Sequence, residues 1–136
     1  MKILVTGSSG QLGSITVKLL KAHGHTIYGI DIIPSATTDE LIDLKNKEAI
    51  MAVCRGYDAI IHTAAIHGKH YELKYPREMF IDTNITGTLN LLNACIKNGI
   101  PKFLFTSTTS IYGEALVDPE KAVWVDESLR EQPRDI

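Results

Sequence analysis

The chain has 136 residues, of which 44% are apolar and 22% are charged, and its formal net charge is −2. This length predicts one domain, and the apolar fraction is too high for a disordered segment. With 14 basic and 16 acidic residues, the chain offers no electrostatic case for binding nucleic acid, and no apolar run is long enough to cross a membrane. Two cysteines without metal or disulfide spacing, and no room for a signal peptide before the first strand, indicate a soluble cytoplasmic protein.

Short apolar runs alternate with helical patterns along the whole chain. In chain order we expect a strand at residues 3–6, a helix at 11–22, a strand at 26–31, a short strand at 41–44, a helix at 47–55, a strand at 58–62, a less regular segment at 66–76, a long helix at 77–98 and a strand at 102–106. This alternation implies parallel strands, because a parallel return needs a long crossover. Right-handed crossovers with a reversal after the third strand give the order 3-2-1-4-5, an α/β fold with a Rossmann-like doubly wound parallel sheet.

Two of the expected helices carry apolar residues at helical spacing. In the first helix, one face holds Leu12, Ile15, Leu19 and Leu20. In the long helix, one stripe holds Phe80, Asn84, Gly87, Leu91 and Ala94, and beside it lie Ile85, Leu89, Leu92 and Ile96. Cys54 and Cys95 fall on apolar helical faces and are interpreted as core thiols.

Three glycines, Gly7, Gly10 and Gly13, lie between the first strand and the first helix. A tight strand-to-helix turn needs a residue that adopts positive φ, and a pyrophosphate needs backbone amides that no Cβ obstructs. Asp31 ends the next strand 18 positions after Gly13, close to the spacing at which a carboxylate binds an adenosine ribose. The pattern predicts a dinucleotide site, and the alternative is a glycine-rich turn followed by an unrelated aspartate.

Asp31 also bears on the choice of cofactor. Its carboxylate would repel a 2′-phosphate, and the next residues, Ile32 and Ile33, offer no positive charge to receive one. The sequence therefore predicts NAD rather than NADP as the cofactor.

Five segments match the motifs of one family, and they occur in the order that the family has them. They are TGSSGQLG at 6–13, DL at 43–44, DAIIHTAA at 58–65, NITGTLNLL at 84–92 and FLFTSTTSIYG at 103–113. In these segments the chain resembles the extended short-chain dehydrogenases/reductases. These are NAD-dependent epimerases and dehydratases that act mostly on nucleotide sugars.

The resemblance implies a cofactor site and one catalytic hydroxyl. The cofactor-binding residues it implies are Gly7, Ser9, Gly10, Gln11, Leu12, Gly13, Asp31, Asp43, Leu44, Thr63, Ala64, Ala65, Asn84 and Thr106. Among them, the glycines would hold the pyrophosphate, Asp31 the ribose, and Asp43 with Leu44 the adenine. Thr108 would orient and polarise the reacting hydroxyl or carbonyl group. An alternative register would assign that role to a neighbouring hydroxyl, among Thr106, Ser107, Thr109 and Ser110.

The family's general base is a tyrosine with a lysine four residues later, whose charge lowers the phenol pKa. None of the five tyrosines of this chain is followed by a lysine at that spacing. The resemblance places the missing pair near residues 132–136, where the sequence ends. We therefore expect residues 1–136 to be an incomplete NAD-binding Rossmann domain. It would stop before the sixth strand, the catalytic helix and the substrate region, and would be inactive as it stands.

The function implied for the parent enzyme is hydride transfer on a small-molecule substrate, a nucleotide sugar or a related polyol. The alternative, favoured by the absent tyrosine–lysine pair, is a non-catalytic NAD(P)-binding sensor or interaction module. An uncovered sheet edge and uncovered helix faces predict self-association, so we expect a homo-oligomer.

Three histidines, His62, His67 and His70, fall within nine residues and raise the question of a metal site. His62 ends a strand and the other two lie in the irregular segment, so nothing in the pattern holds all three together. We expect no metal site, and we expect residues 66–75 to border the active-site cleft because they follow a central strand.

Overall fold

The computed structural model describes residues 1–117 and 122–133, in two compact units. Unit 1 is Met1–Thr106 and unit 2 is Ser107–Ile136. Unit 2 contains a 3₁₀-helical segment, η2 (Thr109–Leu116), which kinks at Gly113 (φ 41°, ψ −108°). In the same unit, Trp124 is 94% exposed.

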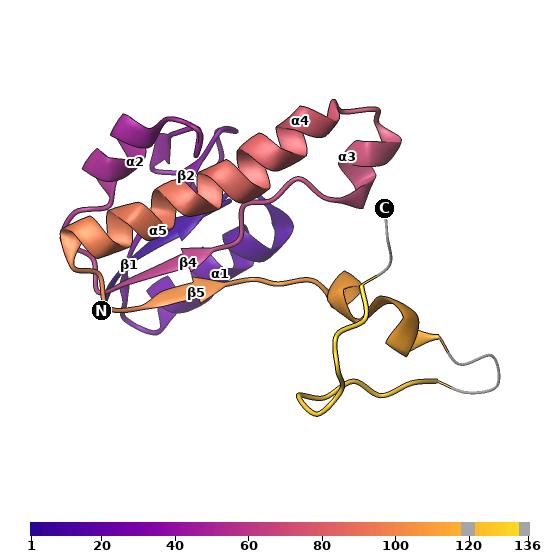
Figure 1. Cartoon of the computed structure of the whole chain (residues 1–136). Coiled ribbons are helices and arrows are strands. Elements are labelled where there is room, and N and C mark those ends of the chain that lie inside the picture. Colours follow the sequence, from indigo (N-terminus) through magenta and orange to yellow (C-terminus); the bar gives the residue numbers. More distant parts are fainter. Residues whose placement is uncertain (118–121, 134–136) are drawn as a thin grey trace. The chain divides into compact units, whose positions relative to one another are not determined.

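Unit 1 is built on a five-stranded parallel sheet in the order β3-β2-β1-β4-β5, as the sequence predicts (Figure 1). The strands are β1 (Lys2–Thr6), β2 (Thr26–Asp31), β3 (Glu40–Leu41), β4 (Ala59–His62) and β5 (Phe103–Phe105). The central strand β1 pairs with β2 on one side and with β4 on the other. In an open sheet of this kind, ligands bind at the carboxyl ends of the strands where the strand order reverses, which here lies between β1 and β4.

Helices cover both faces of the sheet (Figure 1). The helical segments of unit 1 are α1 (Gln11–Ala22), α2 (Lys47–Val53), α3 (Gly68–Glu72), α4 (Arg77–Phe80), the π-helical η1 (Ile81–Thr86) and α5 (Gly87–Asn98). One core joins Leu4 and Ile60 of the sheet to Ile50 of α2 and Leu91 of α5. The other core, on the opposite face, joins Ile3 and Val5 to Val17 of α1. Successive residues of β1 therefore alternate between the two cores, as the pleat of a strand requires.

Most predicted bounds differ from the structure by no more than two residues at an end, and the segment 66–76 contains the short helix α3. Two predicted elements differ further. β3 has two residues instead of the predicted 41–44, because the chain leaves the sheet after a last backbone bond from Ile42 to Asp31 and turns at Asp43. The predicted helix 77–98 is interrupted by η1, where the N–H of Gly87 donates to the carbonyl of Asp82, five residues back. An extra residue in one helical turn changes which side chains face the sheet after it.

Of the three apolar stripes predicted on the helices, the one that holds Gly87, Leu91 and Ala94 faces the core, and the other two are largely exposed. In α1 the buried residues are Gly13 and Val17, whereas Leu12, Ile15 and Leu19 are about half exposed. In α5 the residues facing the core are Gly87, Asn90, Leu91, Ala94 and Cys95. The neighbouring stripe of Ile85, Leu89, Leu92 and Ile96 is exposed. Cys54 and Cys95 are buried in the first core, as predicted, and burial raises the pKa of the Cys54 thiol to about 12.

Within the described parts of the chain, none of the helices has both the length and the apolar character that a bilayer crossing requires.

Candidate functional site

A pocket of about 570 Å³ lies within unit 1, beyond the carboxyl ends of β1, β2 and β4. This volume falls in the range typical of small-molecule and cofactor sites. The pocket is lined by Gly7, Ser9, Gly10, Gln11, Leu12, Gly13, Ile30, Asp31, Ile32, Ile33, Ile42, Asp43, Leu44, Lys45, Thr63, Ala64, Ala65, Ile66, His67, His70, Tyr75, Met79 and Thr83. Twelve of the fourteen residues predicted to bind the cofactor are in this set; Asn84 and Thr106 are not.

The glycine turn packs so closely that side chains are excluded at two positions. Gly7 has φ +72°, and a Cβ there would lie 2.6 Å from the backbone nitrogen of Ala64. A Cβ on Gly13 would lie 2.0 Å from the carbonyl oxygen of Gly7. These contacts bring the start of α1 against the ends of β1 and β4, at the edge of the pocket.

The amino terminus of α1 opens on this pocket without a side chain capping it. The N-cap residue is Gly10, which offers no side-chain acceptor, and the first turn contains no acidic residue. The first amides of a helix have no partner within the helix and carry a partial positive charge. The arrangement is suited to an anionic group such as a pyrophosphate.

Asp31 is held at the end of β2 by three backbone amides. One carboxylate oxygen accepts from Ser9 N (2.9 Å), and the other accepts from Ile32 N (2.7 Å) and Ile33 N (3.1 Å). The first bond ties the carboxylate directly to the glycine turn. A carboxylate has about four lone-pair positions, so it keeps acceptor capacity for a hydroxyl group in the pocket.

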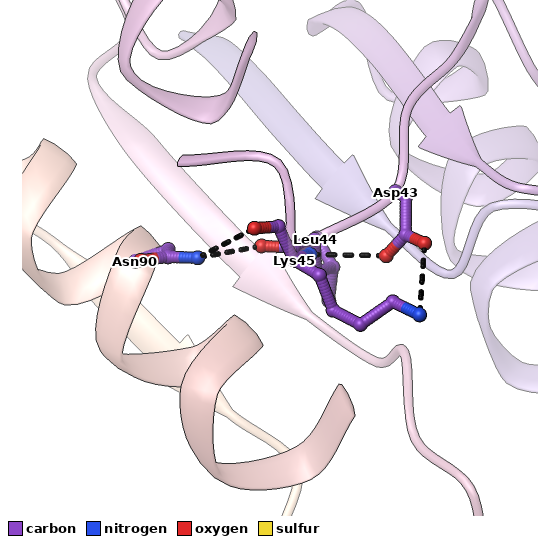
Figure 2. Close-up of polar contacts among 4 residues, drawn as sticks. All are labelled: Asp43, Leu44, Lys45 and Asn90. Atoms are coloured by element: carbon purple, nitrogen blue, oxygen red, sulfur yellow. Dashed lines mark hydrogen bonds and ion pairs between the residues drawn. The ribbon is translucent and has the colours of Figure 1, made fainter. Parts of the chain in front are cut away.

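Residues 43–45 form another wall of the pocket. Figure 2 shows the polar contacts that these residues make with one another and with Asn90. The Asp43 carboxylate accepts from Lys45 N at 3.0 Å and pairs with Lys45 Nζ at 3.4 Å. Leu44 turns its side chain into the core beside α5. The Asn90 amide, on α5, donates to the carbonyls of Leu44 (2.9 Å) and Lys45 (3.5 Å). Lys45 was not among the residues predicted from sequence.

The turn after β4 lies against the glycine turn. The Thr63 hydroxyl donates to the carbonyl of Thr6 at 2.7 Å, and Ala64 is the residue that a Cβ on Gly7 would strike. Thr63, Ala64 and Ala65 all line the pocket.

Asn84 and Thr106 instead bind backbone near the pocket. The Asn84 side chain accepts from Ile66 N (2.8 Å) and donates to Ile66 O (2.7 Å), so it clamps a residue of the pocket wall. The Thr106 hydroxyl donates to the carbonyl of His62 at 2.8 Å.

The segment expected to border the cleft does line the pocket, through Ile66, His67, His70 and Tyr75. The His67 and His70 rings lie 4.8 Å apart and the His70 and Tyr75 rings 5.2 Å apart, both edge to face. Met79 and Thr83 also line the pocket and were not predicted. Met79 and Thr83 are four residues apart, about one helical turn, and this spacing could have placed them on the same face of the predicted helix.

His62 is separate from the other two histidines and almost completely buried. Its Nε2 lies 2.9 Å from the hydroxyl of Thr88, which itself donates to the carbonyl of Asn84, so Nε2 carries the proton and donates. Its Nδ1, 2.6 Å from the hydroxyl of Thr6, is then the acceptor. Burial lowers the pKa of His62 to about 4. This neutral histidine joins the end of β1 to η1 and α5.

Thr108, the predicted catalytic hydroxyl, lies in unit 2 as the N-cap of η2. Its Oγ1 accepts from Ser110 N at 3.2 Å and donates to Ser110 Oγ at 3.1 Å. Both contacts are within its own turn.

Comparison with known proteins finds one family model, described as the NAD dependent epimerase/dehydratase family, which matches residues 3–134. An uncharacterized UDP-glucose epimerase of Bacillus subtilis, YtcB, is 36% identical over 132 residues, 84% of this chain and 42% of that protein. A UDP-glucose 4-epimerase of Klebsiella pneumoniae is 32% identical over 132 residues, which are 84% of this chain and 94% of that protein. The first curated relatives are longer, and the chain spans 38% and 42% of the length of two of them.

Solved structures agree with the fold. A UDP-glucose 4-epimerase of Thermus thermophilus, in complex with NAD, is 30% identical with a TM-score of 0.81, over 98% of this chain and 45% of that one. A short-chain dehydrogenase/reductase superfamily protein of Agrobacterium tumefaciens with bound NAD is 29% identical, also with a TM-score of 0.81, over 99% of this chain and 40% of that one.

Proposed function

Because this chain belongs to the NAD-dependent epimerase/dehydratase family, we propose that it provides the NAD-binding part of an enzyme that acts on a nucleotide sugar or a related polyol by hydride transfer. One observation carries the proposal. The uncapped amino terminus of α1 and the amide-held carboxylate of Asp31 open on the same pocket at the switch point of the sheet.

The residues of the pocket fit NAD. The space that a Cβ would fill at Gly7 and Gly13 is taken by close backbone packing, which brings the uncapped amino terminus of α1 to the pocket, where its first amides could bind a pyrophosphate. Asp31 would accept hydrogen bonds from the adenosine ribose, and Asp43 with Leu44 would flank the adenine. NAD, when bound, supplies the nicotinamide carbon that accepts and returns a hydride.

The chain's own contribution is to bind and orient. Thr63, Ala64 and Ala65 would border the cofactor along the end of β4, and the Asn84 clamp on Ile66 fixes the wall that follows them. In the parent enzyme, the hydroxyl of Thr108 would orient the reacting hydroxyl or carbonyl group. The relatives named for UDP-glucose support a nucleotide sugar as the substrate class.

The 136 residues contain no tyrosine followed four positions later by lysine, so they hold no base of the family's kind. We therefore expect the chain to bind NAD without turning over a substrate. A non-catalytic NAD sensor is the second candidate, favoured by this same missing pair.

The test is titration of the purified chain with NAD, NADP and ADP-ribose by calorimetry. We expect saturable binding of one NAD per chain, with NADP weaker because its 2′-phosphate would face Asp31. Asp31→Ala is expected to weaken NAD at least ~10-fold, since hydrogen bonds to a charged group are the stronger ones. Asp58→Ala is the matched control, because its carboxylate also accepts a backbone amide, Lys2 N at 2.7 Å, but does not line the pocket.

Absence of NAD binding by the wild-type chain would reject the proposal. Unchanged titration of Asp31→Ala would reject the ribose assignment alone. Robust conversion of UDP-glucose by the pure chain with NAD would show that its base lies outside the tyrosine–lysine pattern.

A further inference from the structure

Asn90 is a buried amide on the face of α5 that packs against the sheet. The residue is 6% exposed, and its neighbours on that face are Gly87, Leu91 and Ala94. A polar side chain in such a place is stable only when it is hydrogen bonded. Its side-chain nitrogen donates to one short stretch of backbone, the carbonyls of Leu44 and Lys45.

This stretch has little other support from the sheet. β3 ends at Leu41, and after the bond from Ile42 to Asp31 the chain turns away, with Asn46 N donating to Asp43 O at 2.9 Å. The Asp43 carboxylate binds Lys45 N and Lys45 Nζ, so the wall formed by residues 43–45 is a local loop (Figure 2). The carbonyls of Leu44 and Lys45 therefore accept from the Asn90 side-chain amide instead of from a neighbouring strand.

Gly87, one turn before Asn90, lets α5 come close enough for this contact. A Cβ on Gly87 would lie 2.8 Å from Leu44 Cβ and 3.4 Å from Leu44 Cδ1. The missing side chain at 87 and the amide at 90 together set the distance between the helix and residues 43–45.

We propose that Asn90 is a positioning residue for the adenosine half of NAD, acting through the Leu44 and Lys45 carbonyls on the Asp43 carboxylate. The inference rests on the proposed function, because it takes residues 43–45 as the adenine wall of the pocket. Asn90 does not line the pocket itself, so its effect on binding is transmitted by the backbone of the loop.

The test is a double-mutant cycle between Asn90→Ala and Asp43→Ala in the 136-residue chain, read out as the Kd for NAD and for ADP-ribose. Asn90→Ala is expected to raise the Kd for both ligands about tenfold, which corresponds to the free energy of one lost buried hydrogen bond. In a chain that already carries Asp43→Ala, adding Asn90→Ala is expected to raise the Kd for NAD little further. The reason is that both residues act on the same contact with the adenosine half of NAD.

Asn98→Ala is the matched control. Asn98 lies on the same helix and donates to a backbone carbonyl, that of Met51 at 3.3 Å, but it serves α2 and not the pocket wall. A purely structural role predicts that thermal stability falls in both variants while affinity for NAD, measured on folded protein, does not change. Gly87→Ala is the second variant, because its Cβ would displace Leu44. This variant should weaken the binding of NAD although it keeps the Asn90 side-chain amide.

The inference is overturned if folded Asn90→Ala and Gly87→Ala bind NAD like the wild type, if Asn98→Ala weakens NAD equally, or if the cycle is additive. If Asn90→Ala does not fold, the Gly87→Ala titration decides. A wild-type chain that binds no NAD rejects the proposed function, and the inference with it. A wild-type chain that binds NAD while these variants bind equally well rejects the inference alone.

Discussion

At the scale of single residues, the buried His62 makes the stability of the fold depend on pH below neutrality. Its ring is enclosed between Thr6 and Thr88 and lies near the rings of Phe103 and Phe105, with centroids 6.0 and 5.6 Å away. Both ring nitrogens are used, so a second proton would break the acceptor bond to Thr6 as well as place a charge in the core. Burial lowers the pKa of His62 to about 4.

The free energy of unfolding is therefore expected to fall as the pH is lowered. The unfolded chain takes up a proton on this histidine near pH 6.5, and the folded chain does so only near pH 4, so the unfolded state binds more protons between these values. At about 1.4 kcal/mol per pH unit, the loss over this range is on the order of 3 kcal/mol. Denaturant unfolding at a series of pH values measures it.

The variant His62→Gln isolates this contribution, because glutamine does not titrate. It is expected to lower stability at neutral pH and to flatten the slope between pH 6.5 and 4. His23→Gln, at an exposed histidine, is the matched control and is expected to keep the slope. A slope that is the same in His62→Gln and in the wild type would contradict the prediction.

At the scale of elements, the contact of the glycine turn with α1 connects stability and binding. A Cβ at position 13 would lie 2.0 Å from the Gly7 carbonyl oxygen and 2.9 Å from Thr63 Oγ1. Because the first of these atoms is backbone, α1 must move away from the turn to accept the side chain.

We expect Gly13→Ala to lower the free energy of unfolding by ~1–3 kcal/mol, the usual cost of overpacking, and to abolish measurable NAD binding. Chemical denaturation and calorimetric titration check the two effects separately. Gly68→Ala is the control, because a Cβ there meets no atom within 4 Å. Normal NAD binding by the Gly13→Ala variant would show that the turn tolerates a wider spacing.

The elements that sequence predicts best are those with strong local signals. Residues 26–31 and 11–22 are a strand and a helix with the predicted bounds, since a glycine turn and apolar periodicity mark them. The length of β3 was wrong because the loop at Asp43 is held by Asn90, a contact across 46 residues that no local pattern reveals. The π-helical η1 was missed for a similar reason, since its five-residue bond leaves no mark in hydrophobic spacing.

The candidate site was predictable where it follows the strand ends. Gly7, Asp31 and Ala64 line one pocket because the carboxyl ends of parallel strands meet there. Lys45, Met79 and Thr83 came to the pocket through the loop after β3 and through α4 with η1, whose positions depend on tertiary packing. Sequence likewise placed Asn84 with the cofactor, while its side chain binds the backbone of Ile66.

At the scale of the molecule, unit 1 carries two exposed apolar stripes. On α1 they are Leu12, Ile15 and Leu19, and on η1 and α5 they are Ile85, Leu89, Leu92 and Ile96. Both sets repeat at steps of three and four, so each forms a continuous strip along its helix. Single exposed leucines are common, but contiguous strips are characteristic of surfaces that bind another protein or another copy of the chain.

We expect the 136-residue chain to self-associate through these strips, because burying them removes apolar side chains such as Ile96, 82% exposed, from water. Sedimentation equilibrium over a range of concentrations measures the association. The pair Leu89→Lys with Ile96→Lys should shift the chain toward monomer if the α5 strip carries the contact, and Ile15→Lys with Leu19→Lys should do so if the α1 strip does. Leu73→Lys, at a leucine that is also exposed but lies outside both strips, is the control and should leave the association unchanged. A wild-type chain that stays monomeric at the highest concentration would contradict the prediction for both strips at once.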